Sequence, residues 1–261
     1  MTTKLRPSRA LVRFSGAEAQ KLLFDVVTGR LLAEPGDPVW WALLSPQGKI
    51  QAEGLSLWRD DAFWLDVDQS VADGFIKRMK MYRLRAKVDI DDLRESHVVG
   101  ADETALKGHV IGTEADAVGW SPPDDDYDAA RIGEGVAELG PDFAPDSVFP
   151  HDIGMDLLGG VDFQKGCYIG QEVVSRMQHR GTARRRPVIV AGLSADVPAG
   201  TPVLVAGRDS GAIGRPVNGR AVGIVRLDRF DGGAVTVGGA PVEMTLPGWA
   251  TYKLGESAAA D

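Results

Sequence analysis

Hydrophobic and polar residues follow alternating strand and helix periods along the first ninety residues. ALVRFSG (10–16) has the period of a strand, and AEAQKLLFDVV (17–27) has apolar residues at helical spacing. Residues 40–68 predict successive strands with a Pro-Gln-Gly hairpin turn. Ser70 is the predicted cap of a second helix over 71–84, and AKVDI returns to a strand. This order predicts an α+β fold with a split βαβ unit.

The pattern changes after Arg184-Arg185-Arg186-Pro187. Before it, SHVVGAD and HVIGTEADAVGW predict a second α+β unit, followed by the acidic loop SPPDDDYD. Beyond it, short β-rich runs separated by Gly and Pro are typical of a small antiparallel barrel or sandwich. We expect an α+β region of two interleaved subdomains over 1–183, a C-terminal β-barrel over 184–255 and a tail over 256–261.

Charge and cysteine content narrow the classes of function. The net charge of -8 argues against a general nucleic-acid coat protein. A single cysteine, Cys167, forms no internal disulfide and cannot hold an iron–sulfur cluster alone. The four histidines have no zinc-ligand spacing, and no stretch approaches the roughly 20 apolar residues of a membrane span. We therefore expect a soluble, cytoplasmic protein with no resident metal and no membrane partner.

The single cysteine lies in KGCYIGQE, Lys165–Glu172, just before a predicted helix that starts near Gly170. The helix N-terminus and the nearby Lys165 both favour the thiolate form of Cys167. The glycines on both sides let the backbone bend and let a ligand approach closely. The alternative interpretation of this pattern is a small buried thiol that only packs.

KGCYIGQE resembles the K-G-C-[YF]-x-G-Q-E signature of the YgfZ family, folate-binding proteins that assist iron–sulfur enzymes. The similarity extends back through LLGGVDF and forward to HRG, and it is weaker in LVRFSGAEAQKLL, LLSPQGKI and YRLRAKVDI. The family resembles the aminomethyltransferase (T-protein) of the glycine cleavage system in fold. The resemblance implies a ring of α/β subdomains around a hole the size of tetrahydrofolate, closed by a C-terminal β-barrel.

The resemblance also implies roles for the residues of the signature. Cys167 is expected to be a redox-active or transient ligand residue. Lys165 is expected to hold it as thiolate or to contact a folate carboxylate. The remaining residues of the motif, which set the loop and the start of the helix, are Gly166, Tyr168, Gly170, Gln171 and Glu172.

Further residues fall where the resemblance implies contact with tetrahydrofolate or a derivative. They are Arg9, Tyr127, Arg131 and Glu134. Arg176 and Arg180 lie one turn apart on the predicted helix of the signature, and this spacing predicts that they rim the same site. Tyr127 stands where relatives carry an aromatic that stacks on folate. In the R-x-E-x-G pattern Gly133 replaces the glutamate that contacts the pterin, and Glu134 follows one residue late. Ala52 replaces the first acidic residue of the T-protein hairpin, and this departure argues against glycine-cleavage chemistry.

Basic residues gather in two clusters in this acidic chain. The first cluster is Lys77, Arg78, Lys80, Arg83, Arg85 and Lys87, and the second is Arg176, Arg180, Arg184, Arg185 and Arg186. One interpretation is an anionic partner, either the glutamate tail of folate or RNA phosphates. The other is a solvated helix face balanced by carboxylates such as Asp124–Asp126, and it is favoured for the first cluster.

The sequence and its resemblance together predict a tetrahydrofolate-binding protein that assists assembly or repair of [4Fe–4S] enzymes, including enzymes that modify tRNA. The implied partners are folate and iron–sulfur client enzymes, with contact to tRNA as a further prediction. Two alternatives stay open: a folate-dependent aminomethyl or one-carbon transferase, and a module that binds tRNA or client proteins without catalysis.

Overall fold

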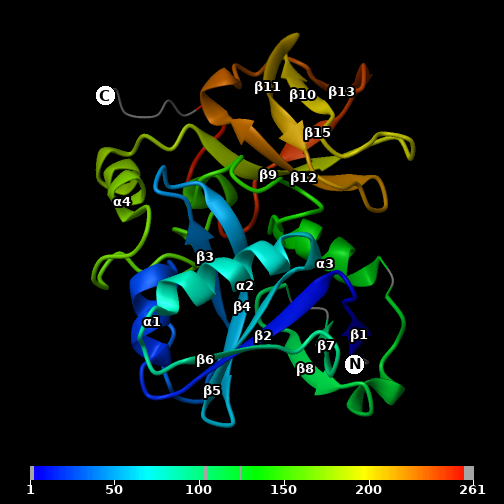
Figure 1. Cartoon of the computed structure of the whole chain (residues 1–261). Coiled ribbons are helices and arrows are strands. Elements are labelled where there is room, and N and C mark those ends of the chain that lie inside the picture. The colour runs from blue at the N-terminus through cyan, green and yellow to red at the C-terminus, as the bar shows by residue number, and fades with distance from the viewer. Residues whose placement is uncertain (1–2, 103–104, 124, 256–261) are drawn as a thin grey trace.

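Three antiparallel sheets organise the part of the chain that this computed structural model describes, residues 3–102, 105–123 and 125–255. Figure 1 shows the first two sheets in the lower half of the molecule and the third, formed by C-terminal strands, in the upper half. The predicted tail over 256–261 lies outside the described residues.

The first sheet has the strand order β3-β4-β5-β2-β6, and every neighbouring pair is antiparallel. Its strands are β2 (Arg9–Ser15), β3 (Val39–Leu44), β4 (Ile50–Arg59), β5 (Ala62–Asp68) and β6 (Asp89–Asp92). Helices α1 (Ala19–Val26) and α2 (Gln69–Arg83) pack on one face of it. The predicted order of strands and helices is present, with three strands in the segment 40–68.

Alternation along the strands decides which side chains face the helices. In β3, Trp41 joins the core beneath α1 and α2, whereas its neighbour Trp40 packs on the other face of the sheet. In β4, Ala52 lies in the helix-side core, and Glu53 therefore points to the opposite face. That opposite face carries the polar groups of the candidate site.

Helix α2 begins two residues before the position that the predicted Ser70 cap implies. Asp68, the last residue of β5, is the N-cap instead, and its carboxylate accepts a hydrogen bond from the Ser70 amide at 2.9 Å. The prediction of Ser70 as the cap was therefore wrong, because an aspartate two residues earlier satisfies the same amide donors.

The second sheet has the order β1-β7-β8 and lies beside β2. Its strands are β1 (Lys4–Leu5), β7 (His97–Ala101) and β8 (His109–Thr113), followed by the short helix η1 (Asp116–Gly119) and by α3 (Asp126–Glu134). Helix α3 ends at Gly135, whose positive φ of 70° reverses the chain direction. The reversal brings residues 136–142 alongside the sheets.

The third sheet has the order β14-β13-β10-β11-β12-β9-β15. Its strands are β9 (Arg185–Ala191), β10 (Pro202–Val205), β11 (Arg208–Ile213), β12 (Arg220–Arg226), β13 (Val235–Val237), β14 (Ala240–Pro241) and β15 (Glu243–Thr245), with η3 (Leu227–Arg229) after β12. Its own core includes Val188, Val203 and Val225. Trp249 Nε1 donates to the Glu134 carbonyl oxygen at 2.7 Å, so this sheet is attached to the end of α3.

Helices η2 (Pro150–Ile153) and α4 (Gln171–Arg180) precede the third sheet. Asp152 accepts hydrogen bonds from the Phe149 amide at 2.9 Å and from Arg185 at 2.5 Å, which joins η2 to the start of β9. Only Val174 of α4 is buried. Among the residues described, no helix is both long and apolar enough to cross a membrane.

Candidate functional site

Seven ionisable side chains form a central charge cluster on the sheet face opposite α1 and α2. The cluster consists of Arg6, Arg9, Glu53, Asp66, Arg131, Glu138 and Asp142, and none of these side chains is more than 13% exposed. The start of β2, strands β4 and β5, helix α3 and the segment after α3 each contribute to it. Charges buried to this degree persist only when they are paired or hydrogen-bonded.

Arg9 is the centre of the pairing on the sheet. Its Nε and Nη2 donate to the two carboxylate oxygens of Asp66, each at 3.1 Å, and Nη2 also donates to the Glu53 carbonyl oxygen at 3.0 Å. Its remaining nitrogen, Nη1, lies 3.6 Å from Glu53 and 3.7 Å from Glu138, and it makes no hydrogen bond within the described segments. One strong donor of Arg9 is thus left over inside the molecule.

Arg131 has a similar arrangement beneath α3. Its Nε donates to Asp128 at 2.6 Å, and its Nη1 donates to Asp142 at 2.5 Å and to the Val136 carbonyl oxygen at 3.2 Å. Its Nη2 is buried and has no hydrogen-bond partner in the part of the chain described. Buried donors are normally satisfied, so the unused nitrogens of Arg9 and Arg131 are a feature that a bound ligand would explain.

Burial and pairing shift the pKa values of the cluster carboxyl groups in different directions. Burial favours the neutral acid and raises the pKa of Glu53 to about 6, although Arg9 opposes the shift. Burial likewise raises the pKa of Asp142 to about 6 against the effect of Arg131. For Asp66, burial is outweighed by Arg9 and His109, and its pKa falls to about 2. The cluster therefore combines a permanently ionised carboxylate with two that take up protons in weak acid.

His109 lies beside this carboxylate and is buried. Its Nδ1 is 3.7 Å from Asp66, and neither ring nitrogen makes a hydrogen bond to any residue that the structure describes. Burial lowers the pKa of His109, which keeps the imidazole neutral at physiological pH.

Two neighbouring cavities border the cluster. The larger, about 470 Å³, is walled by residues 4–8, 123–128 and 138–141, and the smaller, about 20 Å³, reaches the inner guanidinium of Arg131. Arg6, Tyr127 and Glu138 line both cavities. The larger one has the size of a small-molecule site.

The walls of the larger cavity come from both halves of the molecule. Arg215, in the loop after β11, extends to its rim and pairs with Asp125 and Asp128, each at 2.9 Å. Glu138 is the only one of the four cluster carboxylates that lines this cavity, and Arg6 holds both of its oxygens, at 2.5 and 2.7 Å. The pKa of Glu138 is lowered because Arg6 and its two neighbouring arginines outweigh burial.

Tyr127, predicted to stack on folate, lies in this wall. Its hydroxyl donates to the Ala105 carbonyl oxygen at 3.3 Å, and the guanidinium of Arg6 covers its ring at 4.0 Å from the centroid. One face of the ring is therefore already occupied by a cation, and stacking of a ligand requires the other face or a movement of Arg6.

The predicted partner of the thiol, Lys165, has a different set of contacts. Its ammonium donates to the carbonyl oxygens of Phe24 at 2.9 Å, Gly29 at 3.2 Å and Val27, all at the C-terminal end of α1. Burial lowers the pKa of Lys165 to about 8, and the C-terminal carbonyls of a helix favour the cation. All three donors are used, so this geometry does not fit the predicted roles of Lys165 beside Cys167 or on a folate carboxylate.

The signature glycines are explained by close packing. Gly170 has a φ of +78°, and a Cβ at this position would lie 2.6 Å from the Ser45 carbonyl oxygen and 3.1 Å from the Gly48 Cα. Gly170 therefore fits α4 against the β3–β4 hairpin. At Gly166 a Cβ would lie 3.3 Å from the ring of Phe24, where contact is tight and φ is not positive.

The rest of the motif divides between core and surface. Tyr168 is buried beside the Lys165 ammonium, which lies 5.0 Å from its ring centroid. Cys167 is exposed, which excludes the interpretation of a packed, buried thiol. Glu172 pairs with Arg176 at 2.8 Å on the exposed side of α4. The exposed or partly exposed residues of this helix include Gln171 and Arg180.

The structure separates the predicted site residues into two groups. Arg9, Tyr127 and Arg131 meet at the central charge cluster, whereas the signature loop and α4 lie elsewhere. Figure 1 shows α4 and α3 on opposite sides of the molecule, with α2 and the strands of the first sheet between them. The predicted placement of Arg176 and Arg180 on the rim of the folate site does not agree with this arrangement. Glu134 is exposed at the end of α3 and lines neither cavity at the cluster.

Sequence reasoning missed Arg6, Asp66 and Glu138 as site residues. Arg6 and Asp66 carried a usable signal, because a charged residue beside or within a strongly apolar strand pattern is unusual and pairs with an opposite charge. Glu138 follows Glu134 by one helical turn, but α3 ends between them, and only the reversal at Gly135 brings Glu138 to the cavity. Over 3–102, 105–123 and 125–255, no group of three or more His, Cys, Asp or Glu side chains is placed to hold a metal ion.

Comparison with known proteins agrees with this architecture. Residues 184–252 match the family model described as the CAF17 C-terminal beta-barrel domain. The chain is similar in fold to the aminomethyltransferase T of the glycine cleavage system from Bartonella henselae, with a TM-score of 0.75, 13% identity and coverage of 97% of this chain and 87% of that one. The predicted fold class, a T-protein-like α+β region with a C-terminal barrel, is confirmed.

Relatives are found along most of the chain. The mitochondrial iron-sulfur cluster assembly factor IBA57 of Mus musculus is 31% identical over 232 residues, which cover 70% of this chain and 65% of the relative. The homologue from Mycosarcoma maydis is 29% identical, with coverage of 74% and 57%, and that from Pyricularia oryzae is 28% identical, with coverage of 69% and 54%. The chain thus spans between half and two thirds of the length of these relatives.

These relatives correct the predicted location of the protein and change the family to which it is most usefully compared. They are named as mitochondrial proteins, which contradicts the predicted cytoplasmic location. The argument failed because a lone thiol indicates a reducing compartment without saying which one. The resemblance was drawn to the YgfZ family, whereas the relatives found carry the name IBA57. The chain therefore combines an aminomethyltransferase-like fold with a C-terminal segment that matches the CAF17 beta-barrel model, and it is similar along most of its length to the IBA57 assembly factors.

Proposed function

We propose that this chain is an iron–sulfur cluster assembly factor that binds tetrahydrofolate or a derivative in its larger cavity and uses Cys167 as a functional thiol. The similarity to proteins named as iron-sulfur cluster assembly factors supports the first part. The clients expected from the sequence resemblance are [4Fe–4S] enzymes, among them enzymes that modify tRNA.

One observation carries the folate proposal: Glu138 presents a carboxylate to a cavity of about 470 Å³. The buried donors of Arg9 and Arg131 that have no partner in the described segments belong to residues that line the neighbouring cavity of about 20 Å³. The pyrimidine edge of a pterin offers adjacent N–H donors, and an ionised carboxylate accepts them in parallel. Its carbonyl oxygen in turn needs donors, and Arg6 and Arg215 line the same cavity. The residues present therefore fit this ligand class.

Glu138 takes the place that the sequence pattern assigned to Glu134. Arg6 orients its carboxylate, and the three arginines of the cluster keep it ionised, as the lowered pKa indicates. Tyr127 supplies the aromatic wall, and Arg215 closes the rim from the barrel side. A bound folate would supply one-carbon or redox chemistry, and the chain would bind and orient it away from bulk water.

Cys167 acts at a different place in this proposal. Its thiol is exposed, four residues before α4 begins, so a partner protein has direct access to it. A cluster in transit is cargo, and it normally takes about four protein ligands, of which this loop supplies one. The remaining ligands must come from the partner, so the folate cavity and the thiol serve separate steps.

Calorimetric titration with tetrahydrofolate tests the cavity. Glu138→Gln is expected to weaken binding at least about tenfold, because it removes the charge on which the paired hydrogen bonds depend. Glu134→Gln is the matched control, since Glu134 is exposed four residues away, and it should bind as the parent does. Tyr127→Leu provides a second wall variant if Glu138→Gln unfolds. Equal loss in both glutamine variants, or no binding by the folded parent, would reject the folate proposal.

A complementation assay tests the thiol. In cells that lack the endogenous protein, Cys167→Ser should fail to restore the activity of a [4Fe–4S] enzyme while its folded yield and folate affinity stay at the parent level. Full restoration of enzyme activity by Cys167→Ser would remove the thiol from the mechanism and leave the folate proposal intact.

A further inference from the structure

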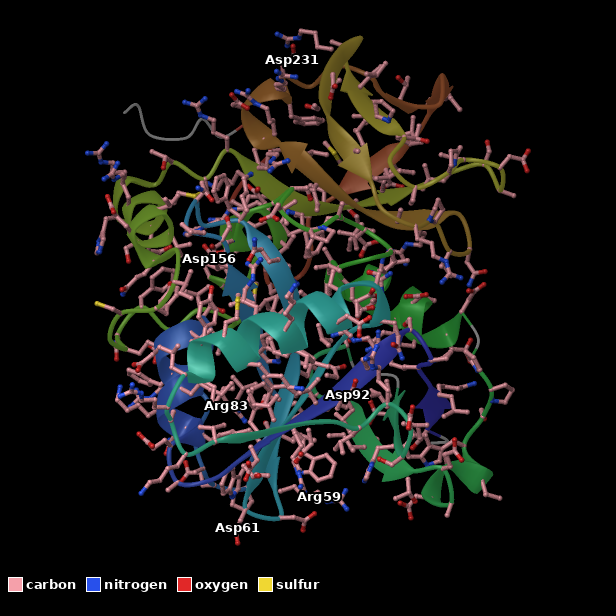
Figure 2. The ribbon with its side chains drawn as sticks, in the orientation of Figure 1. Arg59, Asp61, Arg83, Asp92, Asp156 and Asp231 are labelled. Carbon is pink, nitrogen blue, oxygen red and sulfur yellow. The ribbon has the colours of Figure 1, made fainter. Side chains whose placement is uncertain are left out.

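The C-terminal end of α2 carries a cluster of cations without counter-charges. We call it the basic α2 terminus; it consists of Lys77, Arg78, Lys80, Arg83, Arg85 and Lys87. In the ranges that the structure describes, no carboxylate oxygen lies within 4 Å of any of these six cationic groups, whereas the nearby arginines Arg13 and Arg94 are paired with Asp91 and Asp92. Figure 2 labels Arg83 on the α1 side of the molecule.

The carboxylates expected to balance this cluster are engaged elsewhere. Asp125 pairs with Arg215, and Asp126 pairs with Lys4, on the other side of the sheet; Asp124 lies outside the described residues. At least three acids lie near the cluster. Glu18 accepts a hydrogen bond from the Lys87 amide at 2.8 Å, and Asp89 lines the adjacent groove. Asp92, which pairs with Arg94, is close enough to Lys80 for that lysine to contribute to lowering its pKa. The six cations still outnumber them, so the local surface is positive in a chain of net charge -8.

Two large apolar side chains stand among these cations. Met81, in the last turn of α2, is 56% exposed, and Leu84, the C-cap that follows this turn, is 85% exposed. Basic side chains precede and follow both in the sequence. The result is a positively charged surface with an apolar tip.

Leu84 holds its position against a steric penalty. It is the C-cap of α2 with φ 43° and ψ −105°, a backbone conformation that glycine adopts freely and leucine rarely does. A leucine that is both strained and exposed gains nothing from the folded chain itself. An apolar environment supplied from outside would stabilise it.

A groove of about 470 Å³ lies beside the tip. It is lined by Gly16, Ala17 and residues 83–89, which include three cations, Arg83, Arg85 and Lys87, and one acid, Asp89. A groove edged by cations can accommodate phosphate-bearing groups.

We propose that the basic α2 terminus docks on an anionic phospholipid surface, with Leu84 and Met81 inserted among the acyl chains and the six cations at the headgroups. A lipid leaflet offers negative charge and an apolar layer within a few ångströms, which matches this surface. RNA is less suited, because its bases stack on exposed aromatic rings and the one aromatic here, Tyr82, packs on the core. The expectation of no membrane partner rested on spanning segments and does not concern such a peripheral contact.

Vesicle co-sedimentation of the full chain tests this inference. Vesicles of phosphatidylcholine with phosphatidylglycerol should bind the protein, and vesicles of phosphatidylcholine alone should not. Raising the salt concentration from about 0.1 M to about 0.5 M should weaken binding, because salt screens the attraction between the cations and the headgroups. Removing two cations in Arg85→Gln with Lys87→Gln should weaken binding about 30-fold, at roughly 1 kcal/mol per basic residue. Leu84→Gly should weaken it about tenfold.

Leu84→Gly keeps the test independent of folding, because glycine relieves the strained backbone and should leave the melting temperature unchanged or higher. Leu32→Ser is the matched apolar control, since Leu32 is 43% exposed elsewhere, and Arg220→Gln with Arg229→Gln is the matched charge control in the barrel. Both controls should bind like the parent. Absent binding, equal binding to neutral vesicles, or binding that depends on the cations but not on Leu84 would overturn the proposal, and the last result would indicate an acidic macromolecule instead.

Discussion

The central charge cluster collects its side chains from several distant segments, whereas the signature loop, Lys165–Glu172, is one continuous run of eight residues. The cluster is buried and is held together by ion pairs. The loop is held by close backbone contact at Gly170 and by the Lys165 ammonium on the end of α1, and its thiol faces solvent. Electrostatics determines the first region, and steric fit determines the second.

This difference shows which residues of each region are available for function. In the loop, Lys165, Tyr168 and Gly170 are occupied with packing, and the free chemistry is the thiol. In the cluster, Arg9 and Arg131 line a cavity and each keeps a buried donor with no partner in the described segments, so under our proposal its charges serve both stability and binding. A motif that is contiguous in sequence is therefore mostly structural here, and the dispersed residues are the better candidates for ligand contact.

The largest effect is expected from breaking the cluster. Arg131→Met would leave Asp142 buried without its partner and Asp128 with one partner fewer, and it should lower the free energy of unfolding by about 3–5 kcal/mol. Arg215→Met is the control, because the Arg215 side chain is itself 52% exposed and one of its two partners, Asp125, is exposed. We expect this variant to lower the free energy of unfolding by less than about 1 kcal/mol. Urea unfolding measures both. Similar losses in the two variants would show that the cluster does not depend on burial.

The contrast between the regions also explains what could be predicted from the sequence. Period and turn residues predicted the strand and helix order of the first sheet and the barrel after Arg184. Arg9, Tyr127 and Arg131, which were predicted as folate contacts, lie together in the structure, whereas Arg176 and Arg180 were joined to them only by nearness to the signature. The local sequence does not indicate that the chain reverses at Gly135 and brings Glu138, rather than Glu134, to the cavity. Long-range placement of that kind depends on the packing of whole sheets.

The next largest effect is a change in the pH dependence of stability. Asp142 has a pKa of about 6 in the folded chain against an ordinary 3.8, so the folded state binds its proton more tightly than the unfolded state does. The stability that this proton supplies is present below pH 3.8 and is lost as the pH rises through 6. As the pH rises from 4 to 6, the parent should therefore lose about 2–3 kcal/mol of unfolding free energy that Asp142→Asn does not lose. Urea unfolding of both proteins across this range measures the difference.

Asp66 supplies the control for this experiment, because its shift has the opposite sign. Its pKa of about 2 lies below the ordinary 3.8, so its contribution is present above pH 3.8 and is lost as the pH falls through 2. Asp66→Asn should therefore differ from the parent by a constant amount between pH 4 and 6. If the stability difference between Asp142→Asn and the parent were also constant over this pH range, the tightly held proton could not be assigned to Asp142.

A smaller effect is expected from the signature glycines. Gly170→Ala places a methyl group against the Ser45 carbonyl at a positive φ and should lower the unfolding free energy by about 2 kcal/mol. Gly166→Ala meets only the edge of the Phe24 ring, and it should change stability by less than about 1 kcal/mol. Thermal unfolding of the two variants measures the difference. Equal stability would mean that Gly170 is required for something other than packing.

The smallest effect on stability is expected at the thiol itself. Cys167 is exposed and makes no packing contact that serine would remove, so Cys167→Ser should change the unfolding free energy by less than about 0.5 kcal/mol. The thiol of the folded parent should react with an aromatic disulfide reagent at the same rate in native buffer and in urea. A native rate well below the denatured rate would show that the loop shields Cys167, and it would remove the basis for treating this region, in contrast to the cluster, as open to a partner.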